Sequence, residues 1–228
     1  MIKLTYHGHA CFHIESNGHK LLIDPFITGN PVAKIKPEEL KCNYILLTHG
    51  HNDHFGDTVE IAKRNDATVI ATFELATFCE RQGLKVHGMH IGGGHDFDFG
   101  RVKLTIAHHG SAYIGDTIQY TGNPCGYVLT LGKKNVYHSG DTGLFLDMQL
   151  IGKRNKIDLA LLPIGDNYTM DIDDAVQAAK FLKPKMVIPM HYKTWELIDQ
   201  DPNLFAKKLK GTGIKVKILN FGESFELK

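Results

Sequence analysis

The chain has 228 residues, of which 43% are hydrophobic and 22% are charged, a size that allows one substantial core in a single domain over residues 1–228. Lysine and arginine number 26 against 25 aspartate and glutamate residues, so no global basic field indicates nucleic acid or an anionic membrane surface as a partner. Because neither a secretory signal nor a run of about 18 apolar residues is visible, we expect a soluble cytoplasmic protein.

The first half of the chain begins rich in strands and then alternates helices with strands. Strands are expected at residues 2–6, 11–15 and 20–24. Asn17-Gly18 is a strong hairpin signal between two of them. A loop over residues 25–41 leads to the apolar run 44–48, which has the composition of a buried strand. Four alternating segments follow, at 58–64 (helix), 68–71 (strand), 74–82 (helix) and 85–89 (strand).

The second half of the chain repeats this order. Strands are expected at 103–107, 117–120, 126–131 and 135–138, and later at 159–163, 186–189, 215–219 and 224–227. A helix is expected at 172–182 with Asp171 as its cap, and the last helix begins at Asp201-Pro202 and ends near Gly211. Because a β-rich stretch precedes an α/β stretch twice, we expect two sheets packed face to face with helices outside.

Histidines and an aspartate cluster directly after the predicted buried strand, in the pattern HxHxDH. Imidazole and carboxylate groups bind zinc and similar ions, and four of them within six positions exceed the needs of one tetrahedral ion. Two ions are therefore expected. On a loop, His49 and His51 can converge on one ion while Asp53 and His54 turn toward another. The alternative is an ordinary polar loop, which would rarely combine these residues in this order.

The chain resembles the metallo-β-lactamase superfamily, whose signature is the HxHxDH pattern and whose other motifs follow in order. Asp24 matches the aspartate of the first motif, and His109 matches the histidine of the third. Asp141 matches the bridging aspartate, and His191 matches the final histidine. The resemblance implies an α/β fold, a four-layer αββα sandwich of two mixed sheets with helices outside.

The resemblance also implies a ligand set and a reaction. One ion would be bound by His49, His51 and His109 and the other by Asp53, His54 and His191, with Asp141 bridging both. Two ions about 3.5–4 Å apart can share a hydroxide that attacks the substrate, which makes Asp53 and Asp141 the expected catalytic carboxylates. Zinc is the expected metal, and manganese, iron, cobalt and nickel are also compatible with such ligands.

Further candidates surround this set. Asp24 could orient a ligand histidine or the bridging water, or it could hydrogen-bond to the backbone beside Pro25. His9 resembles an element that one branch of the superfamily places at the mouth of the site, or it belongs to a pair of edge-strand histidines. Asn167, Tyr168 and Thr169 follow a predicted strand and could contact substrate, or they form a turn before a helix. No role is assigned to His7 or His138.

Other segments narrow the branch. His51 stands where the oxygen-reducing diiron branch usually has glutamate, which favours hydrolysis over redox chemistry. His7-Gly8-His9-Ala10, Asp24-Pro25-Phe26 and the segment 163–170 resemble small metal-dependent hydrolases similar to L-ascorbate-6-phosphate lactonase. We therefore expect an enzyme that cleaves an ester, lactone or phosphodiester bond of a small molecule.

Two alternative functions stay open. A nuclease or cyclic-nucleotide phosphodiesterase would be favoured by a basic stripe along the pocket, for which the charge balance gives no indication. A non-catalytic metal-binding protein would be indicated by a lost ligand, and none is missing. We expect no nucleic acid or membrane partner, and a homo-oligomer on general grounds. The four separated cysteines are interpreted as reduced packing residues, namely Cys11, Cys42, Cys79 and Cys125.

Overall fold

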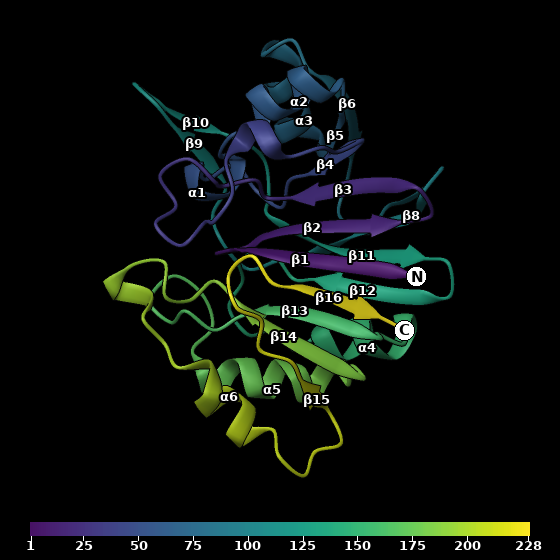
Figure 1. The fold of residues 1–228 in the computed structure, drawn as a ribbon, viewed down its shortest axis with the longest axis vertical. Helices are drawn as coiled ribbons and strands as arrows, with labels where there is room; N and C mark the ends of the chain where they lie inside the picture. The colour runs from purple at the N-terminus through teal and green to yellow at the C-terminus, as the bar shows by residue number, and fades with distance from the viewer.

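Two mixed seven-stranded sheets form the centre of the computed structural model, which describes residues 1–228 (Figure 1). The strands of the first sheet are β1 (Ile2–Gly8), β2 (Cys11–Ser16), β3 (His19–Ile23), β4 (Tyr44–Leu46), β5 (Thr68–Thr72), β6 (Lys85–Met89) and β16 (Ser224–Leu227). Those of the second are β7 (Gly94–Phe97), β8 (Gly100–Ile106), β11 (Cys125–Leu131), β12 (Lys134–His138), β13 (Leu159–Pro163), β14 (Met186–Met190) and β15 (Lys215–Val216). Their orders are β16-β1-β2-β3-β4-β5-β6 and β15-β14-β13-β12-β11-β8-β7.

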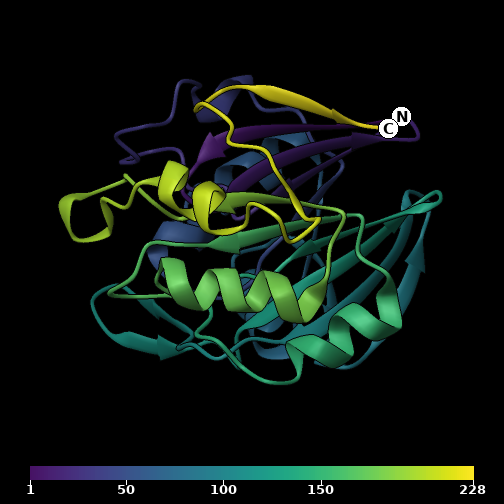
Figure 2. The same cartoon turned by 90° about the horizontal axis from the view of Figure 1, so that it is seen from below.

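Helices cover the outer face of each sheet. They are α1 (Asn52–Phe55), α2 (Thr58–Asn65), α3 (Phe73–Arg81), α4 (Met148–Asn155), α5 (Ile172–Leu182) and α6 (Pro202–Lys208). Helices α2 and α3 lie on the first sheet, and α4, α5 and α6 lie on the second, as the view from below also shows (Figures 1 and 2). The architecture is therefore the expected four-layer αββα sandwich. None of the helices combines the length and apolarity that crossing a membrane would need.

The core explains why the strands near the sheet centre are apolar on both faces. Leu21 and Ile23 of β3 point into the larger cluster of 44 buried residues, which fills the space between the sheets and extends to α5 and α6. Leu22, between them, points into a second cluster of 17 residues shared with α2 and α3. Since helices cover the outer face, alternate residues of one strand are both buried, and each such side chain stabilises the fold by about 1.5–3 kcal/mol.

Most predicted elements are confirmed, several with the same bounds. Helix α5 covers the predicted residues 172–182, and the Asp171 carboxylate accepts the backbone N–H of Asp174 at 2.7 Å as its cap. The predicted strand 215–219 was too long, because only Lys215 and Val216 pair with β14. Four elements were not predicted, namely α1, α4, β7 and β9 (Ala112–Ile114). Strand β9 pairs only with β10 (Ile118–Tyr120), in a separate hairpin.

The loops that carry the candidate ligands meet at one end of the sandwich. His191 follows β14 and donates its backbone N–H to the carbonyl of His9, which follows β1, at 2.7 Å. Asp24 follows β3 and accepts the backbone N–H of Thr48, which follows β4, at 2.8 Å. Helix α1 and the β9–β10 hairpin lie at this end, and the two chain termini lie side by side at the other (Figure 1).

Candidate metal centre

The fold brings the predicted ligands together in two main groups. Within each group, the potential ligand atoms all lie within 4.8 Å of one another. One group consists of His49, His51 and His109, and the other of His9, Asp53, His54 and His191. A further group shares members with both and consists of Asp24, His49 and His54. Histidine and carboxylate donors at this spacing suit zinc and related divalent ions.

A change of backbone conformation inside the HxHxDH segment separates the two groups. His51 is extended, with φ −63° and ψ 147°, and helix α1 begins at the next residue. His49 and His51 therefore precede the helix, whereas Asp53 and His54 lie on it. Gly50 is required between the histidines, because a Cβ there would lie 2.1 Å from the hydroxyl oxygen of Thr121. This whole segment was predicted to be a loop, so α1 was missed.

Asp141 connects the two groups from the turn after β12. Its Oδ2 lies 3.0 Å from His191 Nε2, 3.2 Å from His54 Nε2 and 3.7 Å from His109 Nε2. Asp141 Oδ1 and the Nε2 atoms of His54 and His191 are buried and make no hydrogen bond. Buried polar atoms without partners are costly, and coordination of a cation would satisfy all three. The residues present therefore fit bound divalent ions.

Burial and mutual charge set the protonation of the ligands. Burial lowers the pKa values of His49, His51 and His109, which favours neutral imidazoles with free lone pairs. Burial alone would raise the pKa of Asp141, but the charges of His191 and His54 outweigh it and hold that pKa well below its ordinary value. The carboxylate at the centre is therefore ionised, as a metal ligand must be.

Asp24 is fully buried and contacts one of the candidate ligands. Its Oδ2 lies 2.8 Å from His54 Nδ1, while its two oxygens accept the backbone N–H and the hydroxyl of Thr48 at 2.8 and 2.6 Å. Because Nδ1 of His54 is turned toward Asp24, Nε2 is the ring nitrogen that faces Asp141. Asp24 therefore contacts both a candidate ligand histidine and the backbone of Thr48. Its role in orienting a metal ligand stays a prediction.

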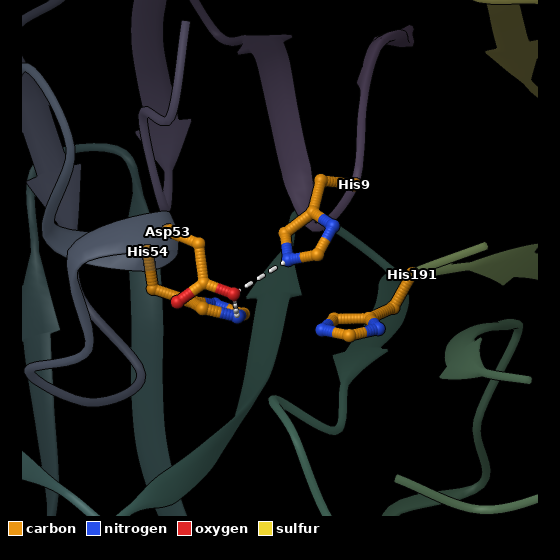
Figure 3. Close-up of side chains that lie close together, drawn as sticks. All are labelled: His9, Asp53, His54 and His191. Carbon is orange, nitrogen blue, oxygen red and sulfur yellow. Dashed lines mark hydrogen bonds and ion pairs between the residues drawn. The ribbon is translucent and has the colours of Figure 1, made fainter. Parts of the chain in front are cut away.

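His9 turns into the site instead of lying along a strand. It adopts a φ of 55° in the turn between β1 and β2. Its Nε2 lies 3.0 Å from Asp53 Oδ2, and its Nδ1 lies 2.9 Å from the hydroxyl oxygen of Thr194. Figure 3 shows His9 facing Asp53 and His54 of α1, with His191 approaching from the end of β14. Burial, with the nearby His191, lowers the pKa of His9 to about 3, so its imidazole is neutral.

A cavity of about 790 Å³ opens in front of the candidate ligands. Of the three residues considered for substrate contact, Tyr168 lines this cavity, whereas Asn167 and Thr169 do not. Six large apolar or aromatic side chains form much of its wall, from Phe26, Phe55, Tyr113, Ile114, Tyr168 and Trp195. Five of these residues were not predicted to line a site. Only Trp195 carried a sign of this in the sequence, because it is the single tryptophan and lies four residues beyond His191.

Two other polar residues near the site have structural partners. His138 Nε2 lies 3.0 Å from the carbonyl oxygen of Ala10, and its Nδ1 accepts the backbone N–H of Gly140 at 3.1 Å. His138 therefore holds the turn that leads to Asp141. The hydroxyl of Ser111 accepts the backbone N–H of Gly50 at 3.1 Å and so connects the HxHxDH segment to the loop after His109.

Comparisons with known proteins agree with this geometry. Residues 3–191 match the family model described as "Beta-lactamase superfamily domain". The chain is 57% identical to a UPF0173 metal-dependent hydrolase of Bacillus cereus strain B4264, over 99% of this chain and 100% of that protein. It is 56% identical to a protein of the same description from Anoxybacillus flavithermus, with the same coverage.

Solved structures give the same result. Igni18, a metallo hydrolase of the archaeon Ignicoccus hospitalis, is 40% identical with a TM-score of 0.91, covering 100% of this chain and 99% of that one. An isothiocyanate hydrolase from Delia radicum gut bacteria is 23% identical with a TM-score of 0.79, covering 99% of this chain and 98% of that one. At that lower identity the likeness concerns the fold alone.

Proposed function

Because this chain belongs to the metallo-β-lactamase superfamily, and within it to the UPF0173 family of metal-dependent hydrolases, we propose that it uses two divalent ions to cleave an ester, lactone or phosphodiester bond of a small molecule. The position of Asp141 supports this proposal most directly. Its Oδ2 lies within 3.7 Å of histidines from both ligand groups. A single carboxylate shared by two groups of ligands is the arrangement that two neighbouring ions require.

The proposed ligand assignment follows the two groups. One ion would be held by His49, His51 and His109 and the other by Asp53, His54 and His191, with Asp141 shared between them. Zinc fits a set dominated by neutral imidazoles, and manganese, iron, cobalt and nickel accept similar ligands. Bound here, such ions would lower the pKa of a water molecule and polarise the carbonyl or phosphoryl oxygen of the substrate.

The chain itself would orient the ligands and hold charge beside the reacting bond. Asp53 and Asp141 both line the cavity, so we assign them as the catalytic carboxylates. Burial would raise the pKa of Asp53, but the hydrogen bond from His9 and the charge of His54 outweigh it and lower that pKa. Asp53 is thus held ionised at the cavity wall, with its side chain 31% exposed, where it can accept a proton from an attacking water.

Metal analysis combined with a substrate panel tests this proposal. The purified protein should contain two metal equivalents and hydrolyse at least one of a set of chromogenic esters, lactones and phosphodiesters. A chelator should abolish the turnover, and added zinc should restore it. Failure to bind metal after reconstitution would overturn the ligand assignment. Full metal occupancy without turnover on any compound would overturn the proposed range of bonds.

A further inference from the structure

Beside the candidate metal ligands, large apolar side chains form much of the cavity wall, and no lysine or arginine lines it. None of its 15 lining residues is a lysine or an arginine, and six are the large apolar or aromatic side chains described above. Resting on the hydrolysis proposed above, we propose that the substrate carries an uncharged aryl or alkyl group that fills this cavity, and no anionic group away from the bond that is cleaved. Three observations support this proposal: the packing of the cavity walls, the exposed apolar side chains at the rim and the charges of the lining residues.

The two aromatic walls of the cavity are held in place by packing. On one side, Trp195 lies with its ring centroid 4.8 Å from that of His9 and 6.0 Å from that of Phe26. On the other side, the ring of Tyr113 packs against those of Phe55 and Phe78 at 5.3 and 5.1 Å. Since both walls are fixed by neighbours, the space between them is a preformed apolar slot beside the ligands.

Strand β9, which carries Tyr113 and Ile114, is also tied to the ligand-bearing helix. The side-chain amide of Asn52, the first residue of α1, donates to the carbonyl oxygen of Ile114 at 2.7 Å and accepts its backbone N–H at 3.0 Å. This pair of bonds fixes the Ile114 side chain at the cavity wall. The apolar wall and the Asp53–His54 pair therefore belong to one connected unit.

The rim of the cavity exposes large apolar side chains. Ile114 is 53% exposed, Tyr168 is 51% exposed and Trp195 is 41% exposed. Single exposed apolar residues are common on protein surfaces, but several that share one cavity with candidate metal ligands indicate a binding surface. An apolar group of the substrate would remove this surface from water, which is favourable.

The charges near the cavity disfavour an anion. Besides the candidate ligands, the only charged lining residue is Asp57, whose Oδ2 accepts the backbone N–H groups of Ile27 and Thr28. A phosphate or carboxylate beyond the reach of the ions would therefore lose water and gain no cationic partner, which is costly. A phosphorylated sugar lactone would need a cationic side chain for its phosphate, and this wall has no lysine or arginine.

Two matched esters test the proposal by turnover. Phenyl hexanoate and monophenyl adipate have the same leaving group and the same chain, and they differ only in a terminal methyl or carboxylate. For the zinc-loaded protein, kcat/KM should be at least about tenfold higher for phenyl hexanoate, because the carboxylate must be desolvated without a partner. Equal or faster hydrolysis of monophenyl adipate would overturn the proposal while leaving the hydrolase function intact.

Binding to the metal-free protein gives a readout that does not depend on turnover. Trp195 is the only tryptophan and lies in the cavity wall, so its fluorescence reports occupancy. Hexanophenone, an uncharged ketone that cannot be hydrolysed, should change this fluorescence saturably, and 6-oxo-6-phenylhexanoate should bind at least about tenfold more weakly. Binding of hexanophenone by a protein that, when loaded with metal, hydrolyses no ester, lactone or phosphodiester would refute the proposed function alone. Absence of hexanophenone binding would refute the apolar cavity proposal.

A pair of lysine variants tests the role of charge in the wall. Ile114→Lys places an ammonium group at the cavity and should narrow or reverse the preference for phenyl hexanoate. Leu150→Lys is the matched control, because Leu150 is 56% exposed on α4 and is not among the lining residues. The control should keep the wild-type ratio of the two esters. An Ile114→Lys protein that folds and also keeps that ratio would contradict the proposal.

Discussion

Asp141 shows how much of the site depends on one buried side chain. It is 2% exposed, its Oδ2 faces three imidazoles and its Oδ1 has no hydrogen-bond partner. Asp141→Asn keeps the shape of the side chain but removes its negative charge. We expect the variant to lose at least one of two metal equivalents and to lose turnover, because a neutral amide is a poor ligand for two cations.

The matched control for this change is Asp147→Asn. Asp147 precedes α4 on the surface and makes no side-chain hydrogen bond to that helix. Elemental analysis after exhaustive dialysis should find the wild-type metal content in this control. Two tightly bound metals in the Asp141→Asn protein would refute the role given to Asp141.

Thr194 is a positioning residue that acts through His9. With His9 neutral, the Thr194 hydroxyl can donate to Nδ1, which leaves Nε2–H to donate to Asp53. Thr194→Val removes the hydroxyl and frees the imidazole to rotate or to change tautomer. Because outer partners of metal ligands typically contribute about 10–100-fold to metal affinity, we expect zinc affinity to fall by about tenfold.

Competition with a chromophoric chelator measures this affinity directly. Thr77→Val is a suitable control, because the Thr77 hydroxyl bonds only to a carbonyl of its own helix, α3. The control should bind zinc as the wild type does. Unchanged zinc affinity in both variants would show that Thr194 does not position Asp53.

The residues of the site differ in how far the sequence could predict them. Asp141 and the HxHxDH segment lie in local motifs, which can be recognised without knowing the fold. The pairing of Thr194 with His9 joins residues 185 positions apart, and only the packing of β14 beside the turn after β1 brings them together. Phe26 was missed for the same reason, since an apolar loop residue carries no local sign of a shared cavity.

At the scale of elements, the turn between β12 and Asp141 needs a residue without a side chain. Gly140 has a φ of +64°, and a Cβ there would lie 2.5 Å from the carbonyl oxygen of Cys125. Gly132, in the turn between β11 and β12, has nearly the same φ of +62°, with nothing within 4 Å of its Cβ position. Comparing a substitution at the two positions therefore distinguishes the cost of backbone strain from the cost of steric overlap.

Alanine at each position gives a matched comparison. Gly132→Ala should lower the free energy of unfolding by about 1 kcal/mol, because only the left-handed backbone is strained. Gly140→Ala should cost at least about 2 kcal/mol more, because strand and turn must also move apart. Urea unfolding of the metal-free proteins measures both values. Equal losses would mean that the turn at Gly140 relaxes freely and does not fix Asp141.

The longest α-helix could be predicted from its periodic pattern, and the shortest α-helix could not. Helix α5 has enough turns to show its apolar face, whereas the four residues of α1 are too few to show any period. The predicted strand 44–48 ends earlier, at Leu46, because the backbone N–H of Thr48 bonds to the Asp24 carboxylate instead of continuing the sheet. The departures at α1 and at residues 47–48 therefore lie where the chain leaves the sheet to build the site.

At the scale of the molecule, the first sheet also buries a histidine that is not a candidate metal ligand. His7 of β1 is 4% exposed, its Nε2 has no hydrogen-bond partner, and its ring lies 6.2 Å from that of His13 on β2. Burial, and secondly the neighbouring His13, lower the pKa of His7 from 6.5 to about 4. The folded protein therefore keeps this imidazole neutral under conditions in which the unfolded chain protonates it.

This difference makes stability depend on pH with a definite sign. Between pH 6.5 and 4 the unfolded chain binds a proton at His7 that the folded protein does not, so the free energy of unfolding falls as the pH falls. The full contribution is present above pH 6.5, and its loss by pH 4 is at most about 3 kcal/mol.

The His7→Phe variant cannot be protonated at this position and should flatten the dependence of the free energy of unfolding on pH between pH 6.5 and 4. Urea unfolding of the metal-free protein at several pH values measures this dependence. His90→Phe, at an exposed position, should keep the shape of the wild-type curve. A His7→Phe curve parallel to that of the wild type from pH 6.5 to 4 would show that the buried His7 is not a source of acid sensitivity.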